Sequence, residues 1–182
     1  MKKMTLLSVS IASILFASQA FAASNNTVTF QGEVTSETCS VTINGNSAKP
    51  IVLLPTVKAS ALATAGSVAG QTTFDVGVSG CTGSTTVPTP VSSVFVGNNI
   101  TTEGNLGNLA ATDAATNVDI QILDTASKAI DFNARAFNGA GDLTVAAKES
   151  AATATYTAQY YATAAAKAGA VESTMQYAVS YN

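Results

Sequence analysis

Apolar residues alternate with polar ones in several short runs, and a period of two residues puts them on one face of a β-strand. Clusters of Gly, Asn and Asp separate the runs, as turns between strands require. The alternating runs are residues 28–34, 74–78, 94–96, 118–122, 156–162 and 175–181. Strands of this length and spacing predict an all-β sandwich or barrel.

The segments between these runs predict turns and loops. Asn44-Gly45 and Asn138-Gly139 are dipeptides that supply the positive φ angles of tight turns. Residues 81–90 are polar, and their prolines cannot donate to a ladder of backbone hydrogen bonds. Residues 58–70 could form a short helical turn or a loose crossing. Residues 162–170 are rich in Ala, which favours a helix, but their place between two alternating runs predicts a connecting loop.

The N-terminus has the features of a secretory signal peptide. Two lysines at positions 2 and 3 precede an apolar run over residues 6–17, and Ala20-Phe21-Ala22 offers the small residues that signal peptidase requires. We therefore expect cleavage between Ala22 and Ala23, with residues 1–22 removed. The apolar run is shorter than the roughly 20 residues of a membrane-spanning helix. A retained anchor is thus the weaker alternative, and no membrane insertion is expected after cleavage.

Export also bears on the state of the cysteines, of which the chain has two, Cys39 and Cys81. An exported protein meets an oxidising environment, so we expect these two residues to form a disulfide. The alternative, a pair of buried free thiols, is usual only in the cytosol. Closing a loop of this size removes roughly 4 kcal/mol of conformational entropy from the unfolded chain.

The composition argues against catalysis. The 182 residues include no His, which excludes the Ser-His-Asp and Cys-His mechanisms and any His-ligated zinc or copper site. Charged residues make up 10% of the chain and the net charge is −3, so we expect no nucleic-acid partner. We expect the aspartates on or beside predicted strands and turns to solubilise edges rather than to form a glycosidase pair. They are Asp113, Asp119, Asp124, Asp131 and Asp142. The prediction is a protein that is not an enzyme, with no cofactor and no metal site.

The alternating run nearest the N-terminus lies ahead of the first cysteine as a separable segment. One face carries Val28, Phe30, Gly32 and Val34, so that a glycine stands where a larger residue would pack better. Glycine weakens a strand unless another backbone or a shallow pocket must come close. By itself this pattern is equally consistent with an ordinary first strand that has a bulge at Gly32.

Several motifs occur in an order that a known family shares. Phe30-Gln31-Gly32-Glu33-Val34 looks like that family's extension motif, aromatic–x–Gly–x–aliphatic, and Cys39 follows it shortly, with Cys81 ahead of a polar loop. Residues 156–162 resemble the family's penultimate strand. Gly169 stands fourteenth from the C-terminus and Tyr181 is penultimate. Over essentially the whole mature chain, the sequence resembles the major subunits of chaperone–usher pili, such as type 1 and P fimbriae.

This resemblance implies an incomplete immunoglobulin-like sandwich that lacks its seventh strand and is completed by donor-strand exchange. It implies a signal peptide at 1–22, an N-terminal donor extension at 23–35 and a pilin domain at 36–182. The donor-strand residues that would enter the next subunit are Val28, Phe30, Gly32 and Val34. The residues that would line the groove, which a chaperone occupies first, are Gly169, Met175, Tyr177, Val179 and Tyr181.

The same resemblance implies a structural role in a surface fimbria of a Gram-negative bacterium. The chain would polymerise head-to-tail with identical or related pilins to build the shaft of an adhesive pilus. Its partners during export through the periplasm would be a periplasmic chaperone and an outer-membrane usher. A minor adaptor or tip subunit of the same system is one alternative. A self-contained secreted carbohydrate-binding module is another, which the absence of Trp disfavours.

Overall fold

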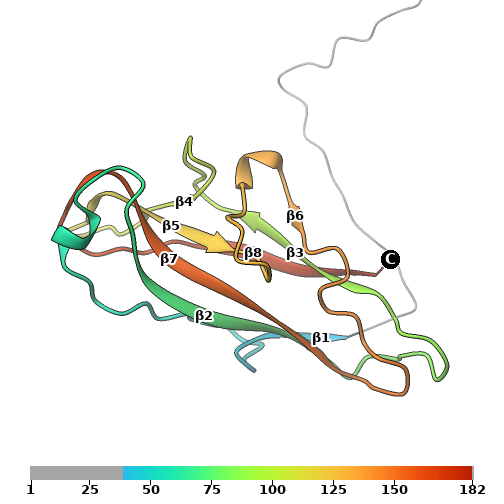
Figure 1. Ribbon diagram of the computed structural model, residues 1–182. Coiled ribbons are helices and arrows are strands. Elements are labelled where there is room, and N and C mark those ends of the chain that lie inside the picture. The colour runs from blue at the N-terminus through green and yellow to red at the C-terminus, as the bar shows by residue number, and fades with distance from the viewer. Residues whose placement is uncertain (1–38, 182) are drawn as a thin grey trace, which may run out of the picture. The chain divides into compact units, whose positions relative to one another are not determined.

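Two antiparallel β-sheets enclose a main hydrophobic core in this computed structural model, which describes residues 39–181 (Figure 1). A smaller buried cluster contains Leu62, Ala115, Val118 and Ala162. The first sheet consists of β1 (Ser40–Ile43), β2 (Val68–Ser79), β7 (Ala152–Lys167), β5 (Thr116–Leu123) and β4 (Leu106–Gly107), in that order. The second consists of β6 (Phe137–Asn138), β3 (Val91–Gly97) and β8 (Met175–Tyr181), in that order. The predicted all-β sandwich is confirmed. The predicted signal peptide and the alternating run at 28–34 lie outside the described residues.

The connections are mostly irregular, with two short 3₁₀ helices in the described part of the chain. These are η1 (Ala59–Leu62), which precedes β2, and η2 (Phe132–Ala134), which precedes β6. Of the two alternatives for residues 58–70, the short helical turn is therefore correct for residues 59–62, whereas residues 68–70 already belong to β2. Residues 81–90 contain no named strand, as their prolines predict.

The core is filled by the inward residues of the alternating runs. Phe74 and Val76 of β2, Ile122 of β5 and Phe95 of β3 are all buried. Phe95 meets Tyr156 of β7 edge-on, with the two ring centroids 4.9 Å apart. A large apolar side chain contributes roughly 1.5–3 kcal/mol when it is buried. The alternation therefore decides which face of each strand turns inward.

A buried hydrogen bond connects the two sheets. Tyr156, which is 1% exposed, donates its hydroxyl proton to Asp142 Oδ2, and Asp142 Oδ1 accepts from the backbone N–H of Ser93 in β3 at 2.8 Å. Burial and the hydrogen bond to Asp142 raise the pKa of Tyr156. Asp142 thus joins β7 to β3 rather than solubilising a turn, which corrects the expectation for this aspartate.

β7 extends to Lys167, so the prediction of a loop over residues 162–170 is wrong for most of that segment. Ala162 is fully buried, and its N–H donates to the carbonyl of Ser67 at 2.9 Å. At the far end of the strand, Lys167 pairs with Thr116 of β5. Neighbours on both sides supply backbone partners, and these override helix-propensity differences of at most about 0.7 kcal/mol per residue.

The predicted turns agree with the structure only in part. Asn44-Gly45 has positive φ angles of 50° and 77°, which confirms the first turn. After Asn138-Gly139 the positive φ angles fall instead on Ala140 (43°) and Gly141 (83°), so the second prediction is wrong. The carboxylate of Asp142 lies against Gly139, where a Cβ would stand. Close approach of a side chain, rather than φ, is what requires glycine at 139.

A row of side-chain amides crosses the outer face of the first sheet. Gln71 Nε2 of β2 donates to Gln159 Oε1 of β7 at 2.8 Å, and Gln159 Nε2 donates to Gln121 Oε1 of β5 at 2.7 Å. Gln121 Nε2 in turn donates to Asn105 Oδ1 at 3.3 Å. These amides join three adjacent strands and the loop before β4 through side-chain hydrogen bonds.

Asp119 lies on the same face of β5 as Gln121 and is only 6% exposed, so the expectation that it solubilises a strand edge is wrong. Its Oδ2 is buried and makes no hydrogen bond of normal geometry within residues 39–181. Burial raises the pKa of Asp119, and the negative charge of Glu103 raises it further, against opposing hydrogen bonds from the side chains of Thr101 and Asn105.

We expect the Asp119→Asn variant to melt at a higher temperature than the parent chain at neutral pH, and the difference to shrink as the pH falls. The raised pKa means that the folded chain binds this proton at a higher pH than the unfolded chain, in which the pKa is about 3.9. The ionised carboxylate therefore lowers the free energy of unfolding at neutral pH, and protonation removes that loss. Circular dichroism melts across this pH range measure the difference. Asp113→Asn, at an exposed loop position, is the control, and a difference independent of pH would contradict the assignment.

Candidate strand-binding groove

β8 forms an edge of the second sheet and has one free side. It pairs with β3 in an unbroken antiparallel register, from Val91↔Tyr181 to Gly97↔Met175. No described strand pairs with its other edge (Figure 1). Such an edge presents backbone N–H and C=O groups to any strand that comes alongside.

A second unpaired segment, residues 50–57, lies across from this edge. The segment belongs to no named strand, and no backbone hydrogen bond joins it to another described residue. Its side chains nevertheless alternate as in a strand: Val52 and Leu54 pack against the core, whereas Ile51 and Leu53 are 81% and 83% exposed. The segment is therefore a strand in its side-chain pattern but has no backbone partner within residues 39–181.

The space between the two unpaired segments is an apolar groove of about 490 Å³, which we call the main groove. Val52 and Leu54 line it on one side, and Met175 and Tyr177 of β8 line it on the other. Its floor is made by inward residues of the first sheet, namely Phe74, Ile120, Ile122 and Ala158. The main groove offers unpaired backbone on two sides and an apolar floor, which is what an extended peptide needs in order to bind by strand addition.

A further cavity of about 460 Å³, the end cavity, lies next to the main groove and shares Tyr160 and Val171 with it. Leu62 of η1 and Val118 of β5 line the end cavity. Tyr160 of β7 thus stands at the boundary between the two cavities, and burial raises the pKa of its hydroxyl. A Cβ at Gly70 would lie 2.8 Å from the Tyr160 ring, so the glycine, at a φ of 65°, makes room for this ring.

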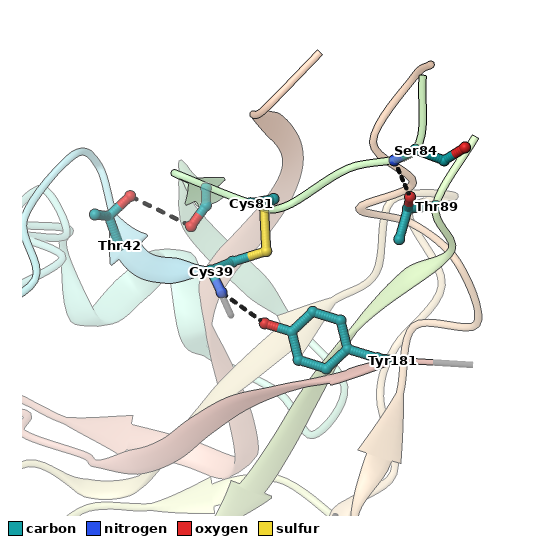
Figure 2. Close-up of a disulfide and its surroundings, with 7 residues drawn as sticks. Cys39, Thr42, Cys81, Ser84, Thr89 and Tyr181 are labelled. Carbon is teal, nitrogen blue, oxygen red and sulfur yellow. Dashed lines mark hydrogen bonds between the residues drawn. A yellow bond between two sulfur atoms is a disulfide. The ribbon is translucent and has the colours of Figure 1, made fainter. Parts of the chain in front are cut away.

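The predicted groove residues of β8 share one half-buried face of the strand. Met175 and Tyr177 line the main groove, while Val179 and Tyr181 pack against the core farther along the same face. Tyr181 Oη accepts a hydrogen bond from the backbone N–H of Cys39 at 2.9 Å (Figure 2). The last strand is thereby fastened to the start of β1.

Gly169 lies elsewhere, in the connection between β7 and β8, where it lines the end cavity and not the main groove. A Cβ at this position would overlap the backbone of residues 113–115. Next to it, Ala170 N donates to Asp113 O at 2.7 Å and Ala115 N donates to Ala170 O at 2.9 Å. Gly169 therefore allows two backbone segments to approach closely, ahead of the first residue of β8.

The predicted disulfide between Cys39 and Cys81 is confirmed, with the two Cα atoms 4.3 Å apart (Figure 2). It joins the start of β1 to the residues just after β2. Because Cys39 also donates its N–H to Tyr181, three strands meet at this end of the sandwich: β1, the end of β2 and the end of β8.

Sequence reasoning missed one wall of the groove and the residue that divides it. The wall is the run Pro50-Ile51-Val52-Leu53-Leu54-Pro55, whose apolar side chains between two prolines were a usable signal, since proline is tolerated at sheet edges. Tyr160 belongs to a predicted strand, but nothing in its sequence context indicates that its ring separates two cavities.

Within residues 39–181 no group of three His, Cys, Asp or Glu side chains is placed to hold a metal ion. Over the same residues, no helix has both the length and the apolar character of a membrane span.

Comparison with known proteins agrees with this geometry. Residues 28–182 match the family described as fimbrial protein. The chain is 41% identical to the F17 fimbrial protein of Escherichia coli over 169 residues, which is 91% of this chain and 92% of that protein. It is 36% identical to the major fimbrial subunit SMF-1 of Stenotrophomonas maltophilia over 168 residues, 88% of this chain and 94% of that protein.

Two solved structures are similar in fold. A chaperone–usher pilus aligns with a TM-score of 0.56 at 21% identity, covering 88% of this chain and 98% of the other. The P pilus rod subunit PapA aligns with a TM-score of 0.55 at 19% identity, covering 79% of this chain and 99% of the other. At these identities the likeness shows a shared fold.

We expect Tyr181→Phe to lower the free energy of unfolding by about 1 kcal/mol, because the variant keeps the ring but leaves the Cys39 N–H without its acceptor. Urea denaturation followed by circular dichroism measures the change. Tyr177→Phe is the matched control, since Tyr177 lies on the same face of β8 and no described residue hydrogen-bonds to its hydroxyl. Equal losses in the two variants would show that the bond to Cys39 contributes nothing.

Proposed function

This chain belongs to the fimbrial protein family and is a structural subunit of a surface fimbria of Gram-negative bacteria, and we propose that it joins its neighbours by donor-strand exchange. Membership of this family also means that it polymerises with other pilins and is not an enzyme. Three features define the proposed linkage: which strand enters the groove, in which direction it runs, and what protects the groove before assembly.

The single observation that carries the proposal is the main groove with its two unpaired sides. A strand placed between residues 50–57 and β8 would give backbone partners to both, and its inward side chains would cover Phe74 and Ile122. A self-contained carbohydrate-binding module has no use for two unpaired edges beside an apolar floor. A strand supplied from outside the domain accounts for both.

We assign that strand to residues 23–35 of another subunit, with Val28, Phe30, Gly32 and Val34 facing inward. Each subunit then presents a strand at one end and a groove at another, and such a contact does not close on itself. The product is an open, head-to-tail fibre. The mature chain would comprise this donor extension and a pilin domain of residues 36–182.

Tyr160 supports a specific register for the donor strand. Because its ring stands between the main groove and the end cavity, the groove is shallow there, and the residue opposite must be small. Gly32 is the residue that meets this requirement. Phe30 and Val34, two residues away on either side and so roughly 7 Å along the strand, would then enter the two cavities.

The same register supports a direction. Two of the inward residues, Val28 and Phe30, precede Gly32, and one, Val34, comes after it. The two residues before Gly32 need the longer of the two spaces, which is the main groove and its continuation along β8 toward Tyr181. The single residue after Gly32 would enter the end cavity. The donor strand therefore runs antiparallel to β8, with Val34 near Gly169 and Val28 toward Val179.

Before assembly the main groove would expose its apolar floor, which calls for temporary cover. We propose that the signal peptide, residues 1–22, is cleaved between Ala22 and Ala23 on entry to the periplasm, and that a periplasmic chaperone then fills the groove with a strand of its own. At an outer-membrane usher, the donor extension of the next subunit replaces the chaperone strand. Met175, Tyr177, Val179 and Tyr181 would contact both strands in turn, and Gly169 would shape the end of the groove.

We expect Gly32→Leu to leave the chaperone-bound subunit at near-normal yield and to abolish fibres. The donor strand is not yet packed in the chaperone complex, whereas in the fibre the new side chain would meet the Tyr160 ring, and overpacking of that kind costs roughly 1–3 kcal/mol. Periplasmic complex and surface fibre are quantified in the same cells, by co-purification and by electron microscopy.

Two further variants make the test specific. Gln31→Leu adds a similar side chain to the opposite face of the donor strand and serves as the matched control, with fibres expected. Tyr160→Leu replaces the ring between the two cavities with a smaller side chain, which makes room for a larger residue opposite it. Combining this change with Gly32→Leu should therefore restore some fibres. Loss of the chaperone-bound subunit in Gly32→Leu would mean that this segment is an ordinary first strand of its own domain.

A further inference from the structure

We propose that the Cys39–Cys81 disulfide is a load bypass: it carries tension from the donor extension into β2 and keeps that tension away from the wall of the groove. This inference rests on the proposed donor-strand linkage, because only then does the fibre pull on the chain just ahead of Cys39. The force would leave the subunit through the strand held beside β8. The load would thus enter at Cys39, in the region that Figure 2 shows, and would leave at the other end of β8, near Gly169, where Val34 of the incoming strand continues into its own domain.

The segments that come after Cys39 along the chain are weakly held, and they make a bypass necessary. β1 has only four residues, Ser40–Ile43, and forms the edge of its sheet, where it pairs with β2 alone. Residues 50–57 come soon after, with no backbone hydrogen bond to another described residue. Tension that entered through β1 would peel this edge strand first and would then meet almost no backbone resistance before β2.

Peeling would damage the site that holds the neighbouring subunit. Val52 and Leu54 line the main groove on the side opposite β8. If residues 50–57 were drawn out, the incoming strand would lose this wall and half of its backbone partners. Tension on a subunit's own donor extension would thus weaken the binding of the incoming donor strand in that subunit's main groove.

The disulfide sends the load elsewhere. Cys81 is buried and lies just after β2, which is inside its sheet between β1 and β7 and pairs with β7 from Val68 to Val78. Cys81 is also held by its own N–H, which donates to Ser150 O at 3.1 Å. The covalent link therefore transfers tension from a four-residue edge strand to a twelve-residue interior strand.

The hydrogen bond from Cys39 N to Tyr181 Oη adds a second, weaker route to the same effect. It connects the entry point of the load to the last residue of β8, the strand that would hold the incoming donor strand. The residues after Cys81 are held by hydrogen bonds as well. Ser84 N donates to Thr89 Oγ1 at 3.2 Å (Figure 2). Thr89 and Val145 also exchange two backbone hydrogen bonds. Tension at Cys81 would therefore not simply extend the loop that follows it, because these hydrogen bonds hold that loop in place.

The test holds purified fibres at constant force with and without dithiothreitol. The attacking thiolate forms a mixed disulfide with one cysteine and frees the other as a thiol; the second thiol of the reagent then attacks the mixed disulfide, which frees the remaining cysteine as a thiol and leaves the reagent as a cyclic disulfide. Attack lengthens the S–S bond, so tension along that bond speeds the reaction. We expect reduction events whose rate rises with force, each giving a step of roughly 95 Å as residues 40–67 extend at about 3.4 Å per residue.

Reduction should also shorten the lifetime of the fibre at a fixed force, on the order of tenfold or more, as the loss of even one buried aliphatic contact in the groove would produce. Fibres without reductant, and reduced fibres at negligible force, are the controls. A reduction rate that does not change with force, measured by thiol labelling, would overturn the bypass. Fibres that fall apart in cold SDS before any pulling would instead contradict the donor-strand linkage, so the two proposals fail separately.

Discussion

Two backbone edges without partners, facing each other across an apolar floor, govern the design of this domain. Backbone groups that lose water without gaining a partner are costly, and so is exposed apolar surface. At the main groove the described chain leaves backbone groups without partners and apolar side chains without cover, because no described strand lies between residues 50–57 and β8. A strand from another molecule meets both needs at once, and polymerisation then supplies what folding of a single subunit leaves incomplete.

The rest of the sandwich is organised so that this groove keeps its shape while it is empty. The cluster of Phe74, Phe95, Phe137 and Tyr156 fills the centre of the core, and the bond from Tyr156 to Asp142 joins the two sheets there. On the outer face of the first sheet, the amides of Gln71, Gln159 and Gln121 hold β2, β7 and β5 side by side. Phe74 belongs both to this aromatic cluster and to the floor of the main groove, so contacts within the subunit hold part of the floor in place.

Sequence reasoning located the last strand well and the rest of the groove poorly, and particular residues show why. Met175 and Tyr177 alternate with polar residues, and alternation alone placed their side chains on the buried face of β8. The resemblance groups Gly169 with them, although this glycine lines the neighbouring end cavity and allows the close approach of residues 113–115. The wrong prediction of a loop over residues 162–167 rests on their place between two alternating runs, because their alanines do not show which face of a strand they occupy. Strand partners more than forty residues away decided that segment.

The sequence alone predicts the central parts of β2, β3, β5, β7 and β8, the faces that these strands bury, and the disulfide, because the two-residue period acts locally and the oxidising compartment acts through a single pair of cysteines. Only the tertiary structure decided that residues 50–57 lie opposite β8, that Tyr160 divides the space between them, and that Cys39 meets Tyr181. Those facts depend on which strands become neighbours in two sheets, and strand order is a property of long-range pairing that no local pattern encodes.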